Sequence, residues 1–230
     1  MNAENSTLYI VATPIGNLGD ITLRALEILR LVDVVAAEDT RQTMKLLSAH
    51  GISKHTVSCR AANEAASAKG LIKWLEEGKS IAYCSDAGTP GLSDPGSILV
   101  GLVREAGFSV VPLPGASAFA SLMSVVGMPG KAVTFEGFLQ IKPGKRKKRL
   151  TELMFREEGA VIYESPFRIL KLLTEIADID GERLVLVGRE MTKIHEEFVR
   201  GTAQEVLQDF QGRSIIKGEF AVFISGQKDT

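Results

Sequence analysis

The sequence predicts an α/β protein composed of two α/β domains. Short apolar runs typical of strands alternate with segments of helical spacing along the chain. A segment rich in proline and glycine, residues 112–116 (PLPGA), interrupts this alternation near the middle. The length of 230 residues is enough for two small domains. We therefore expect domains at residues 1–114 and 115–230.

The first domain is expected to contain a parallel sheet, because strands that alternate with helices are joined by right-handed crossovers. The apolar runs predict strands at 8–13, 32–37, 56–59, 80–85 and 109–113. Helical spacing predicts helices at 22–31, 63–77 and 94–106. The tetrapeptide Asp39-Thr-Arg-Gln42 resembles a capping box that opens a further helix. Asp94-Pro95 is typical of an N-cap followed by proline at the first helical position.

The second domain shows a different order of elements. A helix of small residues is predicted at 115–126, and a strongly basic helix at 144–156. Strands are predicted at 132–138, 160–163, 183–189 and 219–225. Ser165-Pro166 is expected to cap a helix that runs to about residue 176. A capping box, Thr202-Ala-Gln-Glu205, opens a last short helix.

Composition excludes several classes of protein. The net charge of −1 excludes a histone-like protein that binds polyanions through bulk charge. Two cysteines without a CxxC pair and three scattered histidines do not provide a zinc site, so we expect no metal. The uncharged stretch 106–130 contains Pro112, Pro114 and Pro129, so we expect no membrane span. Low cysteine usage and the lack of a signal-peptide pattern favour a cytoplasmic protein.

Two loops follow predicted strands, where parallel sheets bind their ligands. The first, 13–20 (TPIGNLGD), contains Gly16 and fits either a ligand loop or a plain turn. The second, 85–96 (SDAGTPGLSDPG), is longer than a simple connection requires, which favours a ligand loop over a structural turn. Neither matches GxGxxG or GxxxxGK[ST], which argues against dinucleotide binding and P-loop phosphoryl transfer.

Three further segments carry candidate residues. Ser117 and Ala118 begin the hinge helix, where small side chains leave room for a flat ring or simply pack tightly. The run 142–149 (KPGKRKKR) holds six cations and fits either contact with an RNA backbone or a solvated face. It contains no aromatic residue, so we expect no base stacking from it. Segments 163–168 (YESPFR) and 189–197 (REMTKIHEE) follow strands and place Glu164, Lys193 or His195 near a site.

Together these segments resemble the tetrapyrrole-methylase superfamily, in particular its branch of small-subunit ribosomal RNA methyltransferases. TPIGNLGDITLRALE, AEDTRQT, SDAGTPGLSDPG, PLPGASA, EGFL, YESPFR, REMTKIHEE and KGE occur in this order between about Thr7 and Ser225. Each motif is moderately specific, and their ordered combination is highly specific. The resemblance implies two α/β domains with S-adenosylmethionine in the cleft between them, and a homodimer.

The resemblance also implies an activity and its site. The expected reaction is methyl transfer to the 2′-hydroxyl of a cytidine near the decoding site of 16S ribosomal RNA, within the small ribosomal subunit. Asp39, Glu164 and Lys193 are candidates for the base that accepts the hydroxyl proton. The expected cofactor contacts are Asp86, Ala87, Gly88, Thr89, Leu92, Ser117, Ala118, Tyr163 and Glu164. The expected substrate contacts are Pro14, Gly16, Asn17, Arg41, Asn63, Lys142, Lys145, Arg146, Lys147, Lys148 and Arg149.

Two alternatives remain open at this point. The same fold would serve a methyltransferase that acts on a carbon of a tetrapyrrole, because fold does not fix function. A catalytically impaired RNA-binding paralogue is the other alternative. Its motivation is that Arg60-Ala-Ala-Asn63 stands where the family commonly shows an HEHN-like tetrapeptide, and Phe167 where a histidine is usual.

Overall fold

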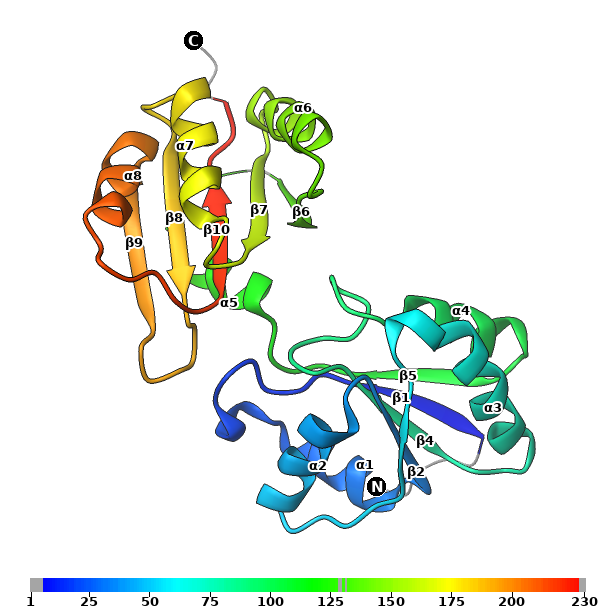
Figure 1. Cartoon of the computed structure of the whole chain (residues 1–230). Helices are drawn as coiled ribbons and strands as arrows, with labels where there is room; N and C mark the ends of the chain where they lie inside the picture. The colour runs from blue at the N-terminus through cyan, green and yellow to red at the C-terminus, as the bar shows by residue number, and fades with distance from the viewer. Residues whose placement is uncertain (1–5, 128–129, 131, 228–230) are drawn as a thin grey trace. The chain divides into compact units, whose positions relative to one another are not determined.

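The computed structural model describes residues 6–127, 130 and 132–227, which form two compact units, Met1–Ser117 and Ala118–Thr230 (Figure 1). The division falls three residues after the expected position at 114/115. Pro129, one of the prolines in the uncharged stretch, lies outside the described residues. Within the described part of the chain, no helix combines the length and the apolar character that crossing a membrane would require.

The first unit contains a five-stranded sheet in which all neighbouring strands are parallel. The strands are β1 (Thr7–Val11), β2 (Val34–Ala37), β3 (Thr56–Ser58), β4 (Ile81–Cys84) and β5 (Ser109–Leu113), in the order β3-β2-β4-β1-β5. The strand ends are level, because Val11 pairs with both Cys84 and Leu113, and Cys84 also pairs with Ala37. The loops after β2, β4, β1 and β5 therefore leave the sheet side by side.

Helices cover both faces of this sheet (Figure 1). The helices α1 (Leu23–Leu31) and α2 (Thr40–Ala49) pack on one face, and α3 (Glu64–Glu76) and α4 (Ser97–Glu105) on the other. Successive strand residues supply opposite cores, as period-two alternation requires. In β1, Leu8 packs toward α3 and α4, whereas Tyr9 and Val11 pack toward α1 and α2. Two short 3₁₀ helices, η1 (Leu18–Asp20) and η2 (Ala61–Asn63), lie in the loops after β1 and β3.

The second unit contains a mixed sheet in the order β6-β7-β10-β8-β9. Only the β6–β7 pair is parallel, and the other three pairs are antiparallel. The strands are β6 (Val133–Phe138), β7 (Gly159–Glu164), β8 (Leu184–Arg189), β9 (Glu197–Thr202) and β10 (Phe220–Ile224). The helices are α5 (Ala118–Val125), α6 (Pro143–Met154), α7 (Ile169–Ile179) and α8 (Ala203–Gln211).

Helices α6, α7 and α8 share one core with one face of this sheet. Val187 points into that core, so its neighbour Gly188 faces the opposite side. A Cβ at Gly188 would lie 2.9 Å from Cδ1 of Leu122, which shows that α5 packs closely on that opposite face.

Some predicted boundaries are wrong for identifiable reasons. The N-cap at Asp94-Pro95 is wrong: α4 begins at Ser97, and the buried Glu64 of α3 accepts the N–H groups of Gly96 and Leu99. The cap at Ser165-Pro166 is also wrong, because residues 166–168 form a turn before α7 begins at Ile169.

Other local predictions are confirmed or corrected in part. Thr202 and Glu205 form the predicted reciprocal capping box. Asp39 is the N-cap of α2, but its carboxylate accepts the N–H of Arg41 and no capping box forms with Gln42. Strand β9 was not predicted, because the polar segment 189–197 hides its start and only Phe198 and Val199 give it apolar character.

Candidate functional site

The loops at the carboxyl edge of the first unit's sheet are tied together by backbone hydrogen bonds. The N–H of Thr13, after β1, donates to the carbonyl of Gly88, after β4, at 2.9 Å. The N–H of Gly88 donates back to the carbonyl of Thr13 at 2.9 Å. The hydroxyl of Thr89 donates to the carbonyl of Ala116, after β5, at 3.1 Å. Three adjacent loops thus form one surface where open α/β sheets bind ligands.

Gly88 is required at the centre of this surface. Its φ of +77° is a backbone conformation that side chains rarely adopt. A Cβ there would lie 3.4 Å from Cγ2 of Ile15 and 3.9 Å from the carbonyl oxygen of Ala116. Gly115 permits a similarly close approach to the backbone after β1, because a Cβ added at Gly115 would lie 3.0 Å from the Cβ of Ala12. Backbone therefore approaches backbone closely at the strand ends.

Carboxylates connect the loop after β2 to the loop after β4. Glu38 Oε2 accepts the N–H of Asp86 at 3.2 Å, and Asp86 Oδ1 accepts the N–H of Asp39 at 2.9 Å. Arg41 pairs with Asp39, with Nη2 and Oδ2 2.6 Å apart. These contacts join the first residue of the loop 86–96 to the start of α2.

The two neighbouring carboxyl groups of this connection have opposite pKa shifts. Hydrogen bonds from the Arg41 side chain and N–H lower the pKa of Asp39 to about 2. Burial raises the pKa of Glu38, and the adjacent charges of Asp86 and Asp39 raise it further. A carboxylate with a raised pKa accepts a proton more readily than one with a pKa near 2. Asp39 is therefore a poor base, and Glu38 becomes the better candidate.

Glu38 was not selected from the sequence, although it stands directly before Asp39 in AEDTRQT. The available signal was its position, immediately after the buried run Val34–Ala37. A carboxyl group at the end of a fully buried parallel strand is partly desolvated, and desolvation raises its pKa.

The remaining predicted residues of the first unit lie along the same edge. Asn17 caps η1 by accepting the N–H of Gly19, and Asn63 accepts the N–H of Arg60. Arg41 lies in the first turn of α2. The structure places the other predicted contacts in the segments that connect β1 to β5 with the elements that follow them: Pro14, Gly16, Asn17, Asn63, Asp86, Ala87, Gly88, Thr89, Leu92 and Ser117. The edge thus gathers every predicted cofactor or substrate residue of this unit.

In the second unit, the basic run forms the first part of α6. Lys142, Lys145, Lys147 and Lys148 are exposed, and none of them makes an ion pair with another residue that the structure describes. Arg149 is half-buried and pairs with Glu136 and Glu152, which raise the pKa of its guanidinium. The start of α6 therefore carries a cationic strip, made up of four exposed lysines without an ion-pair partner among the described residues.

Arg146, which was predicted as a substrate contact, is buried and does not belong to this strip. Its side chain is 2% exposed and lies between two carboxylates. Nη1 is 2.7 Å from Oε2 of Glu164, and Nε is 2.8 Å from Oε2 of Glu175. The reason is helical phase: Arg146 lies four residues before Leu150, at the start of the stripe that packs into the core.

Glu164 was predicted as a catalytic base and as a cofactor contact, and its carboxylate is engaged by other groups of the second unit. It ends β7 with its carboxylate fully buried. Besides Arg146, it accepts the N–H of Ser165 on Oε1 at 2.8 Å, and the same oxygen forms an ion pair with Nε of Arg168 at 2.7 Å. These donors engage both oxygens, so the carboxylate is not open to a substrate proton.

Lys193, the third predicted base, is held by two carboxylates. It lies in the loop between β8 and β9, with Nζ 2.9 Å from Oε1 of Glu190 and 2.9 Å from Oε2 of Glu219. Burial alone would lower the pKa of Lys193, but the two carboxylates outweigh burial and raise it. An ammonium group with a raised pKa is a proton donor of low acidity and holds no free lone pair.

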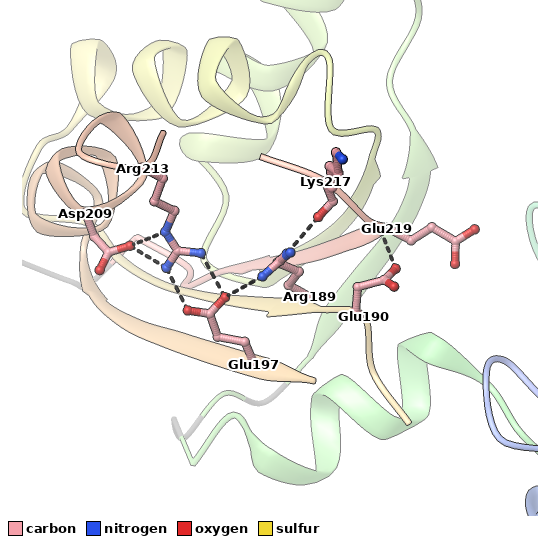
Figure 2. Close-up of polar contacts among 7 residues, drawn as sticks. All are labelled: Arg189, Glu190, Glu197, Asp209, Arg213, Lys217 and Glu219. Carbon is pink, nitrogen blue, oxygen red and sulfur yellow. Dashed lines mark hydrogen bonds and ion pairs between the residues drawn. The ribbon is translucent and has the colours of Figure 1, made fainter. Parts of the chain in front are cut away.

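Figure 2 shows the ion-pair network that surrounds this loop. Glu197, at the start of β9, lies between Arg189 and Arg213, and Arg213 also contacts Asp209. The side chain of Arg189 donates to the carbonyl of Lys217 at 2.7 Å. A depression of about 740 Å³ lies beside this network, and His195 is among its lining residues. Arg189 and Arg213 both have carboxylate partners within the network. The network is therefore suited to holding the antiparallel strands β8 and β9 and the loop between them in place.

The carboxyl edge of the first unit is suited to S-adenosylmethionine. Glu38, Asp39 and Asp86 gather three carboxyl groups at this edge, which would favour the positively charged sulfonium and ammonium groups of such a cofactor. The close backbone approach at Gly88 leaves main-chain groups, rather than bulky side chains, to face a ligand. Within the described residues, no group of three or more histidine, cysteine, aspartate or glutamate side chains is arranged to hold a metal ion.

Comparisons with known proteins agree with this geometry. The family model of the tetrapyrrole (corrin/porphyrin) methylases matches residues 7–207. The chain is 48% identical over 219 residues to ribosomal RNA small subunit methyltransferase I of Borrelia garinii subsp. bavariensis, covering 95% of this chain and 98% of that protein. Identity to the protein of the same name from Thermotoga maritima is 44%, covering 96% and 99% of the two chains.

Solved structures show the same fold at low sequence identity. A cobalt precorrin-4 methyltransferase has a TM-score of 0.68 and 16% identity, covering 96% of this chain and 95% of that one. A diphthine synthase has a TM-score of 0.69 and 14% identity, covering 95% and 90%. The chain belongs to the tetrapyrrole methylase family and, within it, to the group of ribosomal RNA small subunit methyltransferase I.

Proposed function

We propose that this chain transfers a methyl group from S-adenosylmethionine to the 2′-hydroxyl of a cytidine ribose near the decoding site of 16S ribosomal RNA. The observation that carries the proposal is 48% identity along nearly the full length of a ribosomal RNA small subunit methyltransferase I. The proposal includes a homodimer that works on the small ribosomal subunit in the cytoplasm.

The proposed cofactor contacts come mainly from the carboxyl edge of the first sheet. Asp86, Ala87, Gly88, Thr89 and Leu92 would hold the cofactor in the loop after β4, and Ser117, Ala118 and Tyr163 would complete the set. When bound, S-adenosylmethionine supplies a methyl group that its sulfonium already activates. The protein's task is then to align the acceptor oxygen and to exclude water, which is mainly a matter of positioning.

The proposed proton acceptor is Glu38. The ribose 2′-hydroxyl is a weak acid, so a base that takes its proton assists the attack of the oxygen. Glu38 Oε2 is held by the N–H of Asp86, and no described residue donates a hydrogen bond to Oε1. Arg41 is 79% exposed at its side chain and sits beside Asp39, where it would contact an RNA phosphate.

The proposed RNA contacts are Pro14, Gly16, Asn17, Arg41 and Asn63 in the first unit, together with the exposed cations of α6. Lysines bind phosphates as point charges and fix the register of the RNA. Each phosphate contact releases counterions, so RNA affinity should fall steeply with salt.

The deciding experiment offers several acceptors to the protein with labelled S-adenosylmethionine. Small ribosomal subunits and naked 16S ribosomal RNA, both lacking the modification, are compared with uroporphyrinogen III. Label in RNA supports the proposal. Label only in the tetrapyrrole would instead support a tetrapyrrole C-methyltransferase, the candidate that the fold's structural relatives favour. Cofactor binding without transfer to any acceptor would indicate a catalytically impaired paralogue.

A further inference from the structure

The turn after β7 presents a phenyl ring to solvent. Phe167 is 95% exposed, so its ring contributes almost nothing to the folded core. A single exposed apolar residue is ordinary on a protein surface. The surroundings of this ring are what distinguish it.

The turn that carries Phe167 is anchored on both sides. The carbonyl of Ser165 accepts the N–H groups of Arg168 and Ile169, each at 3.1 Å. The buried carboxylate of Glu164 accepts the N–H of Ser165 and forms an ion pair with Arg168, whose Nε–H donates to the hydroxyl of Ser165 at 3.4 Å. Pro166 also restricts the backbone directly before the ring. The phenyl group is therefore held in place by backbone that has little freedom to move.

The same carboxylate joins this turn to the basic helix. Glu164 binds Arg146, which is buried on α6 while its neighbours Lys145 and Lys147 are exposed. One nitrogen of Arg146, Nη2, is buried without a hydrogen-bond partner among the described residues. Burying this guanidinium is costly unless it is paired. The ion pair thus connects the cationic strip of α6 to the turn of Phe167 through one buried contact.

Further aromatic rings lie at the same end of the sheet. Phe138 is 55% exposed and pairs in register with Tyr163, with ring centroids 5.7 Å apart. Because β6 and β7 are parallel, their carboxyl ends meet at one edge, and Phe167 follows β7 by three residues. The Arg146–Glu164 ion pair links α6, with its exposed lysines, to the strand end that carries these rings. Rings and lysines together match the two parts of single-stranded RNA, its flat bases and its phosphates.

We propose that Phe167 stacks on an unpaired base of the RNA strand whose phosphates contact the lysines of α6. Arg146 and Glu164 are positioning residues that hold the ring and the helix in a fixed relation. This inference rests on the proposed RNA substrate and assigns the base contact that the basic run, which lacks aromatic residues, does not supply. Stacking needs only a ring face and accepts any base, so it sets register without reading sequence.

The test measures binding of the full-length protein to a fluorescein-labelled RNA oligonucleotide with an unpaired loop. Phe167→Ala is expected to weaken binding roughly tenfold, and Phe167→Trp is expected to restore it. The slope of affinity against salt stays unchanged in Phe167→Ala, because no phosphate contact is lost. Lys145→Ala instead reduces that slope by about one.

Phe155→Ala is the matched control. Phe155 is also an exposed phenylalanine, at 64%, but it follows the last turn of α6, near the start of β7 and away from the Phe138 edge. It is expected to bind RNA as the wild type does. The inference is overturned if Phe167→Ala binds RNA as tightly as the wild type, or if Phe155→Ala loses affinity equally. It is also overturned if Phe167→Ala changes the sedimentation of the protein, since the ring would then pack against a second copy.

Methyl transfer by the same wild-type preparation separates this inference from the proposed function. If the wild type labels no RNA while Phe167→Ala still weakens oligonucleotide binding, the activity is wrong and the stacking contact stands. If the wild type labels RNA and Phe167→Ala binds normally, the activity stands and the stacking contact is wrong.

Discussion

Glu38 and Asp39 are adjacent carboxyl groups that their surroundings make chemically different. Asp39 is held by Arg41, so its proton affinity is low. Glu38 ends a buried strand beside two other negative charges, so its proton affinity is raised. Pairs of titratable groups whose environments move their pKa values apart commonly mark an acid–base site.

Replacing Glu38 by glutamine tests its proposed role. Glu38→Gln keeps an oxygen that can accept the N–H of Asp86 but removes the proton acceptor. We expect methyl transfer to slow by roughly a hundredfold or more, with RNA and cofactor affinity unchanged. Asp39→Asn is the matched control, and its methyl-transfer rate should be reduced less than that of Glu38→Gln. A Glu38→Gln protein that transfers methyl at the wild-type rate would contradict the assignment.

The pH dependence follows from the direction of the Glu38 shift. Only the carboxylate form accepts a proton, so the wild-type rate should rise as Glu38 loses its proton. Because the pKa of Glu38 is raised, this rise should lie above pH 4.5. Single-turnover rates measured against pH should show the rise in the wild type and lack it in Glu38→Gln. The same rise in the variant would assign it to another group.

Arg146 shows that one side chain in a charge run can belong to the core. Arg146→Met leaves the Glu164 carboxylate buried without one of its two arginine partners. We expect a loss of about 3–5 kcal/mol in the free energy of unfolding, measured by urea denaturation. Lys145→Met, on the exposed face of the same helix, should change it by less than about 0.5 kcal/mol. Equal stability of the two variants would show that the buried ion pair is not required.

The loop between β4 and α4 illustrates how an element positions a site. It contains four residues with positive φ, namely Gly88, Ser93 and the glycines at 91 and 96, so its path is closely defined. Gly88 joins it to the loop after β1, and Thr89 joins it to the loop after β5. Glu64 anchors its far end at the start of α4. The loop thus reaches the carboxyl edge as a fixed surface.

Gly88→Ala tests whether this surface binds the cofactor. Gly78→Ala is the control, because Gly78 also has a positive φ, of +84°, but no atom lies within 4 Å of its added Cβ. Both variants should lose about 1–2 kcal/mol of stability from backbone strain. Only Gly88→Ala should weaken the binding of S-adenosylmethionine in calorimetry. Equal affinity in the two variants would place the cofactor elsewhere.

The elements could be predicted from sequence where the pattern was strong and local. The runs that form β1, β2 and β4 are almost entirely buried and mainly apolar, so their strands were predicted. The cap of α4 was not predicted, because the carboxylate that accepts the N–H groups at its start belongs to Glu64, more than thirty positions earlier in the chain. Strand β9 holds only two adjacent apolar residues on a partly exposed edge, so its pairing with β8 is what identifies it.

The candidate site was predictable in part for similar reasons. The loops of the first unit were expected because carboxyl ends of parallel strands meet at one edge. The ion pairs of the three predicted bases were not expected, and some of their partners are distant in the sequence, as Glu219 is from Lys193. The burial of Arg146 had a local signal that was missed, its spacing of four from Leu150 and eight from Met154.

Across the whole molecule, paired carboxylates make stability depend on acid pH. Arg41 lowers the pKa of Asp39 from 3.8 to about 2, and Arg213 lowers the pKa of Glu197. Groups with lowered folded-state pKa values stabilise the protein above their unfolded values and lose this effect as pH falls. The melting temperature should therefore fall between pH 4.5 and 2. In Arg213→Gln, the melting temperature should fall less steeply with decreasing pH than in the wild type. Identical curves of melting temperature against pH for the two proteins would contradict the role of Glu197.

The position of the methyl group on the RNA tests the central claim most directly. Unmodified small subunits are treated with the protein and S-adenosylmethionine, and the 16S ribosomal RNA is then read by sequencing that detects 2′-O-methyl groups. We predict one new 2′-O-methyl group, on a cytidine near the decoding site, that is absent when Glu38→Gln replaces the wild type. A methyl group on a base, on several scattered riboses or on no nucleotide would contradict the account.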